Sequence, residues 1–492
     1  MNKFRLALVG AVSGALLLAA TASAQGPTAP TGGTSGIQVV NIGTGSADLS
    51  ATYYAENGSA FTLPNQSLTN PGDSYTYFAE PSSESSFSGA AIVSSNEQIA
   101  AIANTAFSSN KGAAYGGSSA GSTSTLLPLV SRNSSGVTSI ISIQNTDTAA
   151  DTTADVAFVS QSGTTTNKSY PVKKGASTIV DLSGETDLGT FIGSATVTPQ
   201  NGTTNLVAAA MNYSNKFVYA YTGFTSVDTT YYLPLIRSGF AGFLTGVQVV
   251  DASGSDVTTT IAYSGFVDKN KNFAQDSGEE YTCTVQATVP GGQSITFFNK
   301  GDVNFTTLFG GSGSATVTGG TCQTNGDANF DAAGGAFLGS ATVTGSANIA
   351  VVVNDVNTAG NSSGAYNGFL ASEASGTIVS PLSRSKFANF TTGTQIQLIS
   401  GSSASCEGSY KTNSASTNTT TPPNTTLNVT TASPSNTFFL PNQWTTGLDA
   451  TNGNQKWLGS LTVTCTGGTV VAITNDAKTA ADASVFNNFP IN

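Results

Sequence analysis

Short runs of alternating apolar and polar residues fill most of the chain, and they recur in the same order four times. Alternation with a period of two predicts strands with one buried face, and the Gly-, Asn- and Ser-rich connections between the runs predict turns. Each copy opens with such a run, and a second run follows about ten residues later. The four opening runs are Ile37-Gln-Val-Val-Asn41, Ile141-Ser-Ile-Gln-Asn145, Val247-Gln-Val-Val-Asp251 and Ile396-Gln-Leu-Ile-Ser400.

The second half of each copy repeats as well. An aromatic residue precedes a Gly-containing strand, and an almost wholly apolar run that ends in Asn closes the copy. A strand that is apolar at nearly every position predicts burial on both faces. The Gly strands begin at Phe87, Phe191, Phe337 and Trp457, the closing runs end at Asn104, Asn212, Asn354 and Asn475, and an aromatic follows each at Tyr115, Tyr221, Tyr366 and Phe486.

Six or seven short strands in about 100 residues fit a two-sheet antiparallel sandwich. The sequence therefore predicts an all-β chain of tandem antiparallel Ig-like β-sandwich modules. We expect a flexible segment at residues 25–35 and modules at residues 36–121, 122–227, 228–371, with insertions, and 372–492. The repeated Asn residues are expected to bond neighbouring backbone at strand ends, and the repeated aromatics to pack in the core.

The first 24 residues have the pattern of a cleavable secretory signal. Positive charges at Lys3 and Arg5 precede an apolar run from Leu6 to about Ala20, and Ala22-Ser-Ala24 precedes Gln25. The apolar run is diluted by small residues and closes on the Ala-x-Ala site, which favours a signal peptide over a membrane-spanning helix. We expect cleavage before Gln25, a secreted product and no transmembrane segment in the mature chain.

Modules two to four each begin with a Pro-Leu strand, and module one does not. These strands contain Leu127-Pro-Leu129, Leu233-Pro-Leu235 and Ser380-Pro-Leu382. Proline suits an edge strand because the missing N–H is not needed there. Module one is either a shorter, self-contained module, which is the simpler interpretation, or a module with an open edge that a neighbouring subunit completes by strand addition.

The composition excludes several classes of function. Charged residues make up only 9% of the chain, the net charge is −11 and histidine is absent. An acidic protein is an unlikely nucleic-acid binder, and the lack of imidazole removes the usual general base and the commonest zinc ligand. No pair of carboxylates recurs with the spacing of a glycosidase. We therefore expect no enzyme, no catalytic residues and no organic cofactor.

One loop in module three has the spacing of a calcium site. Oxygen-bearing side chains lie at positions 1, 3, 5, 9 and 12, and position 7 offers its backbone carbonyl, which is the arrangement by which a single loop wraps a hard cation. Phe273 stands at position 6, where such loops usually have Gly, so a polar hairpin loop is the alternative. The candidate ligands are Asp268, Asn270, Asn272, Ala274, Asp276 and Glu279. A second acidic stretch, Asp327-Ala-Asn-Phe-Asp331, lacks the final carboxylate and reads as an ordinary turn.

The four cysteines occur only in modules three and four, two in each. In an exported protein they are expected to form disulfides, and the pairs Cys283–Cys322 and Cys406–Cys465 keep each bridge within one module. Module three also contains the strand motif Gly-Ser-Ala-Thr-Val twice, at Gly313 and at Gly339, and the sequence does not distinguish which copy fills the standard strand.

Together these motifs resemble a class of bacterial secreted surface proteins built from several such modules. Their repeats run from a Leu-Pro strand to a Gly-Ser-Ala-x-Val strand, an Ile-Ala-Ala-x-x-Asn strand and a final Tyr-x-Gly-Phe. Tyr221-Thr-Gly-Phe224 and Tyr366-Asn-Gly-Phe369 match that ending, whereas Val485-Phe-Asn-Asn-Phe489 departs from it. The resemblance covers nearly all of the mature chain, and its motifs are structural, so it implies no chemistry.

The sequence therefore predicts an extracellular structural surface protein, such as a subunit of an S-layer, sheath or fibre, with structural calcium. An adhesin or carbohydrate-binding protein is the alternative, for which Tyr231-Tyr232 and Phe240-Ala-Gly-Phe243 offer aromatic rings that could stack on sugars. The expected partners are further copies of the chain, other surface components or glycans.

Overall fold

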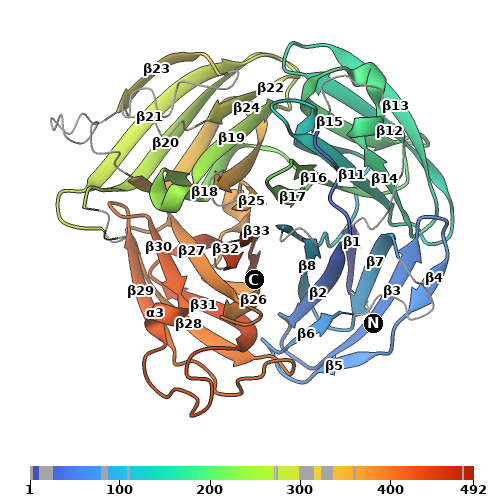
Figure 1. The fold of residues 1–492 in the computed structure, drawn as a ribbon. Coiled ribbons are helices and arrows are strands. Elements are labelled where there is room, and N and C mark those ends of the chain that lie inside the picture. The colour runs from blue at the N-terminus through green and yellow to red at the C-terminus, as the bar shows by residue number, and fades with distance from the viewer. Residues whose placement is uncertain are drawn as a thin grey trace.

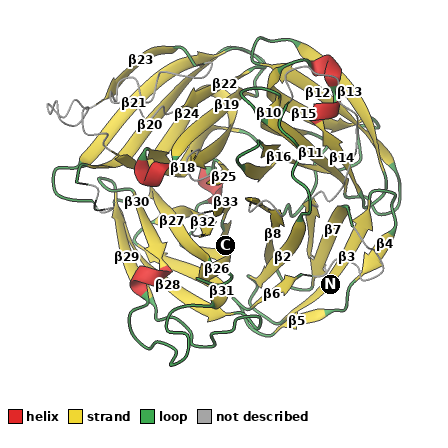
Figure 2. Ribbon diagram, in the orientation of Figure 1, coloured by secondary structure: helices red, strands yellow, loops and turns green. Residues whose placement is uncertain are grey.

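A computed structural model describes residues 4–9, 26–78, 87–107, 111–270, 272, 275–298, 315–322, 336–357, 362–478 and 481–491. The fold is all-β and antiparallel, as predicted, with only a few short helical turns (Figure 2). Among the described residues, no helix has the length and apolar character needed to cross a membrane.

The strands form four two-sheet sandwiches, which we call modules one to four. Module one contains β1 (Phe4–Val9), β2 (Thr34–Asn41), β3 (Ala47–Ala55), β4 (Ala60–Thr62), β5 (Gln66–Leu68), β6 (Ser74–Tyr77), β7 (Gly89–Ser95), β8 (Ile99–Phe107) and β9 (Lys111–Gly116). Module two contains β10 (Thr125–Arg132), β11 (Thr138–Asn145), β12 (Thr152–Ser160), β13 (Thr165–Val172), β14 (Ser177–Asp181), η1 (Leu182–Gly184), η2 (Thr186–Leu188), β15 (Phe191–Pro199), β16 (Leu206–Tyr213) and β17 (Val218–Thr222).

Modules three and four repeat this plan with additions. Module three contains β18 (Asp228–Ser238), η3 (Phe240–Gly242), β19 (Leu244–Asp251), β20 (Val257–Asp268), β21 (Glu280–Val289), β22 (Ser294–Phe298), β23 (Val317–Cys322), β24 (Ala336–Asn357) and β25 (Ser362–Asn367). Module four contains η4 (Ala371–Glu373), β26 (Thr377–Ser385), β27 (Phe390–Ser400), β28 (Ser403–Thr412), β29 (Thr425–Thr430), β30 (Ser435–Phe439), α3 (Leu440–Gln443), β31 (Trp457–Thr466), β32 (Thr469–Lys478), β33 (Ala481–Asn487) and β34 (Phe489–Pro490).

All four modules share one strand order. The sheet that contains the first strand of a module, here called sheet I, runs β10-β15-β12-β13 in module two, and the sheet with the last strand, sheet II, runs β14-β11-β16-β17. The corresponding strands of the other modules pair in the same order, and in module three the long β24 contributes its first half to sheet I and its second half to sheet II. The modules share the two-sheet architecture of immunoglobulin domains, although the order of strands within each sheet differs.

The modules are arranged in a closed ring rather than an extended string (Figure 1). Their last strands meet at the centre, where β9 lies beside β17, β17 beside β25, β25 beside β33, and β33 beside β9. Side chains bond from one last strand to the next: Thr222 Oγ1 donates to the Gly116 carbonyl at 2.6 Å, Asn367 Nδ2 to Thr222 at 2.7 Å, and Asn487 Nδ2 to Asn367 at 2.8 Å.

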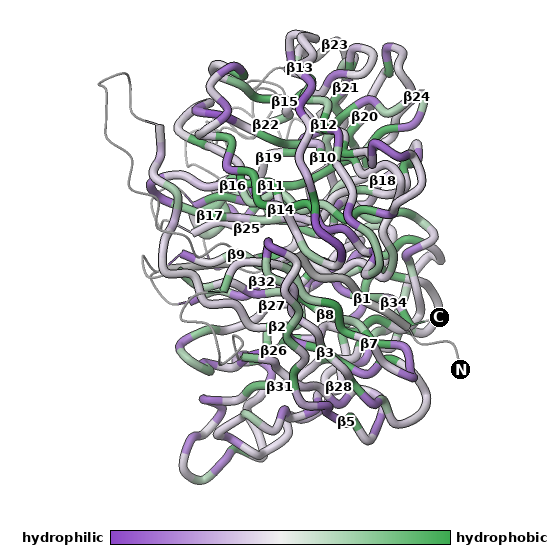
Figure 3. The backbone as a smooth tube through the Cα atoms, turned by 90° about the vertical axis from the view of Figure 1, so that its right-hand side faces the viewer, coloured by the Kyte–Doolittle hydropathy of each residue, from purple (hydrophilic) through white to green (hydrophobic). Residues whose placement is uncertain are grey.

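Each first strand also packs on the next module. Strand β10 contacts β19 and β24 of module three, β18 contacts β27 and β32 of module four, and β26 contacts β2 and β8 of module one. Sheet II of every module is therefore covered by its own sheet I on one face and by its neighbour on the other. This explains why the closing strands are buried at nearly every position, as predicted. In Figure 3, hydrophobic stretches follow strands such as β11 and β16.

The seam between modules four and one closes the ring. Val40, Ile42 and Ala100 of module one form a buried apolar cluster with Val379 of module four. Polar contacts flank this cluster: Asn413 Nδ2 donates to the Ser74 carbonyl at 3.0 Å, and Ser460 Oγ donates to the Gly72 carbonyl at 2.7 Å, although that pair is 388 residues apart in sequence.

The Leu-Pro-Leu and Tyr-x-Gly-Phe motifs form a single structural unit. The Pro lies at a bulge in the edge strand, between Leu127 and Val130 in module two, as the edge-strand prediction requires. The bulge leaves the N–H and C=O of Leu129 without ladder partners. The buried Tyr221 hydroxyl satisfies both, accepting from the N–H at 2.9 Å and donating to the carbonyl at 2.7 Å.

Modules three and four confirm this interpretation in different ways. In module three the Tyr366 hydroxyl binds the N–H and carbonyl of Leu235. In module four Phe486 replaces the tyrosine, and the Ser380 hydroxyl, which stands where the other modules have the first Leu, donates to the Leu382 carbonyl at 3.0 Å. The departure of module four from both motifs is thus one coordinated change.

We expect Tyr221→Phe to lower the free energy of unfolding by roughly 1–3 kcal/mol, because it leaves a buried N–H and a buried carbonyl unpaired. The matched control is Tyr219→Phe in the same strand, since the Tyr219 hydroxyl is buried and makes no hydrogen bond among the described residues. Denaturant unfolding of the two variants tests this difference, and equal losses would contradict the role given to Tyr221.

The glycine of the Gly-Ser-Ala motif is required by a close backbone approach. A Cβ at Gly193 would lie 2.0 Å from the Val159 carbonyl oxygen and 2.9 Å from the ring of Phe191, and the glycines at 89, 339 and 459 are confined in the same way. The preceding aromatic residue therefore covers the glycine in every module. In module three, Gly339 fills this position within β24, whereas the first copy of the motif leads into the additional strand β23.

Gly193→Ala should destabilise the protein by about 1–3 kcal/mol or more, because the methyl group has no room without a backbone shift. Gly184→Ala serves as the control, since nothing lies within 4 Å of a Cβ built there. Thermal unfolding should show a lowered midpoint for the first variant and almost none for the second. A small effect at Gly193 would mean that β12 and β15 are not held as closely as the structure shows.

Candidate functional site

The candidate calcium loop joins β20 to β21 at a hairpin end of module three. Asp268 is the last residue of β20, and Glu279 directly precedes β21; both side chains are buried, whereas Asn270, Asn272 and Asp276 are exposed. Backbone pairing continues up to the loop, with the Val267 N–H donating to the Glu279 carbonyl at 2.9 Å. The hairpin therefore fixes positions 1 and 12 of the candidate loop opposite each other.

Hydrogen bonds draw the other candidate ligands together. Asp276 Oδ2 accepts from the side-chain amides of Asn270 at 2.7 Å and Asn272 at 2.9 Å, and Asp268 Oδ1 accepts from the Asn272 N–H at 3.1 Å. The Glu279 carboxylate accepts from the N–H groups of Lys269 and Asp276, both at 2.9 Å. Ala274, the candidate carbonyl ligand, lies outside the described residues, as do Phe273 and the second acidic stretch at residues 327–331.

Hydrogen bonds from backbone and side-chain N–H groups of the loop hold its carboxylates in place. Across the described residues, no three His, Cys, Asp or Glu side chains gather as a metal-ligating group. The oxygens that a cation would use are instead hydrogen-bonded to backbone and amide N–H groups within the loop. A bound cation would have to replace the hydrogen bonds that Asn270 and Asn272 donate to Asp276. Calcium would do so by taking the amide oxygens and the carboxylate as ligands at one site.

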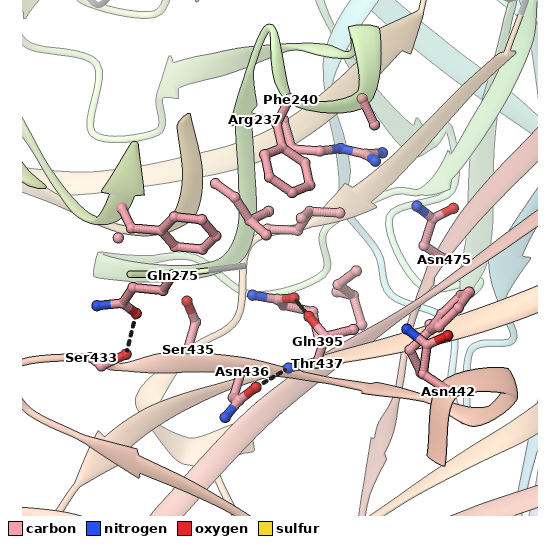
Figure 4. A pocket seen from close by; sticks show the side chains of 18 of the residues that line it. Arg237, Phe240, Gln275, Gln395, Ser433, Ser435, Asn436, Thr437, Asn442 and Asn475 are labelled. Carbon is pink, nitrogen blue, oxygen red and sulfur yellow. Dashed lines mark hydrogen bonds between the residues drawn. The ribbon is translucent and has the colours of Figure 1, made fainter. Parts of the chain in front are cut away.

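The loop also touches module four, which the sequence did not predict. Ser433 Oγ of module four donates to Gln275 Oε1 at 3.3 Å. Gln275 in turn lines a cleft of about 700 Å³ between sheet I of module three and sheet II of module four (Figure 4). The candidate cation loop therefore borders this cleft through Gln275.

Amides, hydroxyls and aromatic rings line the cleft. Phe240 and Phe266 stack edge to face with ring centroids 6.0 Å apart on the module three side. Module four contributes Ser433, Ser435, Asn436, Thr437, Asn442 and Asn475, and Figure 4 shows these polar groups opposite Arg237, Phe240 and Gln275. The buried Asn475 Oδ1 has no hydrogen-bond partner among the described residues. Such a lining suits a polyhydroxylated ligand better than an apolar or anionic one.

The described lining of the cleft carries little charge. No Asp or Glu is among its described lining residues, and its one charged side chain, Arg237, is paired with the buried Asp355 while lying 3.6 Å above the centre of the Phe243 ring. Arg384 and Asp476 make the equivalent pair in module four, where burial raises the pKa of the Asp476 carboxyl and the guanidinium opposes that rise. Each guanidinium group is thus ion-paired with a carboxylate of its own module.

The sequence repeat aligned Asn212 with the Asn of the other three modules, but the structure does not. The ion pairs lie at the position of Asn212. The strand register makes Asn212 equivalent to Asp355 and Asp476, one residue beyond the Asn of modules one, three and four. Asn212 bonds the Leu129 carbonyl at 3.5 Å and accepts from Ser139, as predicted for a strand-end amide. Two features of the sequence could have revealed the ion pairs. Modules three and four each have an Asn-Asp dipeptide at the end of the closing run and an Arg in the first strand.

The two predicted disulfides occupy different places in their sandwiches. Cys406 and Cys465 are bonded across β28 and β31 of sheet I, at opposed register positions. With a sequence separation of 59, this bond constrains the unfolded chain by roughly 4 kcal/mol in the chain-entropy model. In module three the register places Cys283 of β21 opposite Cys322 of β23, as the predicted pairing requires. The bridge there would hold the additional strand, not the standard sandwich.

No family model matches this chain, and no curated protein matches it.

Proposed function

We propose that the protein is an extracellular structural surface protein, a subunit of an S-layer, sheath or fibre. The observation that carries this proposal is the closed ring, in which every module is locked to two others through buried strands. A ring of this kind resists local opening because no module can separate without breaking two seams. The low charge, the cross-strand disulfide and the absence of histidine suit a durable scaffold outside the cell.

Calcium would serve such a scaffold at the loop of module three. The loop lies across the seam between modules three and four, through the contact of Gln275 with Ser433. A cation bound by Asp268, Asn270, Asn272, Asp276 and Glu279, with the carbonyl of Ala274, would fix the hairpin end against module four. We therefore propose a structural role for the metal, not a catalytic one.

Calcium added at about 100 times its dissociation constant should stabilise the protein by roughly 2.7 kcal/mol, seen as a raised unfolding temperature. Glu279→Gln should abolish most of this shift because it removes the final carboxylate of the loop. Glu280→Gln is the control, since Glu280 lies in the same hairpin and is no candidate ligand. Absence of a calcium shift in the unaltered protein, or equal shifts in both variants, would contradict the calcium site.

A carbohydrate-binding adhesin is the second candidate, and the cleft in Figure 4 favours it. Its amides, hydroxyls and Phe rings are the groups that recognise sugar hydroxyls and sugar faces. The absence of a carboxylate among its described lining residues would limit the site to binding.

Electron microscopy of the chain that starts at Gln25, with and without calcium, separates the two functions. Ordered arrays or filaments are expected for a structural subunit. A monomer that binds defined glycans on an array, and loses that binding on Asn475→Ala but not on Asn201→Ala in an exposed turn of module two, would instead establish the adhesin.

A further inference from the structure

The first strand of modules two to four is held by three kinds of contact. It pairs with the neighbouring strand of sheet I, it receives the Tyr or Ser hydroxyl at its bulge, and its N–H after the bulge donates to a hydroxyl of sheet II. In module two, the N–H of Ser131 donates to Ser139 Oγ at 2.7 Å. The equivalent donors are Arg237 to Thr245 at 2.8 Å and Arg384 to Thr392 at 3.0 Å.

In module one a different segment occupies this place. Strand β1 pairs with β7 from Phe4 opposite Ser95 to Val9 opposite Ala90, and it lies against β11 and β16 of module two. These residues belong to the segment that the sequence predicts to be removed before Gln25. The connection is also unlike that of the other modules, because residues 10–33 separate β1 from β2, whereas residues 133–137 separate β10 from β11.

Two docking groups of module one remain unused by β1. Tyr115 is equivalent to Tyr221 by register, its ring is buried, and its hydroxyl makes no hydrogen bond among the described residues. Ser35 is equivalent to Ser139, and among the described residues its hydroxyl bonds only Thr105, at 2.9 Å. Strand β1 ends opposite Ala90, one position before Gly89. In module two the residue equivalent to Gly89 is Gly193, and it pairs with Val130 just after the bulge. Both groups are therefore placed for a bulged strand, which the described residues 4–9 do not supply.

Removal of β1 would uncover a surface that the rest of the ring buries. The edge of β7 would present unpaired N–H and C=O groups, which is the kind of edge that accepts an added strand. Behind it, Ile140, Val207 and Ala209 of module two belong to a buried cluster shared with module one. At the other three seams a first strand covers the same face.

We propose that, in the chain that begins at Gln25, the edge of β7 and the adjoining face of β11 and β16 accept an antiparallel strand from a different protein, because the first strands of modules two to four are already paired within their own ring. The inference rests on the predicted removal of residues 1–24, which the proposed extracellular function shares. The incoming segment has the chemistry of the other first strands: extended, uncharged in its centre, with buried apolar side chains at the positions of Leu127 and Val130. Tyr115 binds its bulge, and Ser35 binds the N–H that follows.

A synthetic peptide of residues 125–132, labelled with a fluorophore, tests the acceptor directly. Fluorescence anisotropy should show saturable binding to the chain of residues 25–492 and at least tenfold weaker binding to the chain of residues 1–492, in which β1 occupies the site. A peptide with aspartate at both the Leu127 and Val130 positions should not bind. Should the shorter chain fold poorly alone, refolding yield with each peptide gives the same comparison.

Tyr115→Phe should weaken peptide binding about five- to tenfold, as expected for one buried hydrogen-bonding hydroxyl. Tyr75→Phe, in sheet II of the same module, should leave it unchanged. Light scattering then tests the source of the strand. A monomer that binds the peptide is expected for a strand supplied by a different protein, whereas an oligomer that the peptide dissociates would contradict that source and assign the strand to a second copy.

Three results would overturn the inference. One is an exported chain that retains residues 1–24, as shown by its mass. Another is a monomer of residues 25–492 that binds no peptide, and the third is an oligomer whose dissociation constant is unaffected by Tyr115→Phe. Peptide binding without arrays in electron microscopy would leave this inference standing while removing the proposed structural function, so the two failures are distinguishable.

Discussion

The fold depends on the first strand of each module, which serves two sandwiches at once. It completes sheet I of its own module, through a bulged pairing in modules two to four, and its outer face covers sheet II of the next module. A bulge at the Pro would normally leave backbone groups unpaired, at a cost comparable to that of a lost hydrogen bond. The Tyr hydroxyl bonds both the N–H and the carbonyl at the bulge in modules two and three, and Ser380 bonds the carbonyl in module four.

Ring closure follows from repeating this arrangement four times. At each seam the first strand of one module packs on sheet II of the next, and β26 of the fourth module packs on β2 and β8 of the first. The central last strands then form a cycle, in which side-chain hydrogen bonds link β9 to β17, β17 to β25 and β25 to β33, and β33 packs against β9. Because sheet II is buried on both faces only within the ring, the apolar closing strands would be poorly suited to isolated modules. The four modules are better regarded as one cooperative unit than as separable domains.

The modules are unequal where they carry specific features. Module three has the hairpin with the candidate cation loop and the added strand β23, and module four has the disulfide between β28 and β31. The cleft that combines aromatic rings with amides lies between these two modules. Module one is distinguished by its first strand, which comes from a distant N-terminal segment, and by Tyr115 and Ser35, which that strand leaves unused.

Local patterns were enough to predict the all-β class, the four repeats, the Pro at an edge strand, the burial of the closing strands, and the pairing of Cys406 with Cys465. These follow from period-two alternation, turn residues and the placement of motifs within one repeat. The closure of the chain into a ring, the place of Gly339 in the standard strand and the correspondence of Asn212 with Asp355 became visible in the folded chain alone. Register and closure depend on contacts such as that between Gly72 and Ser460, and no local pattern records which distant surfaces meet.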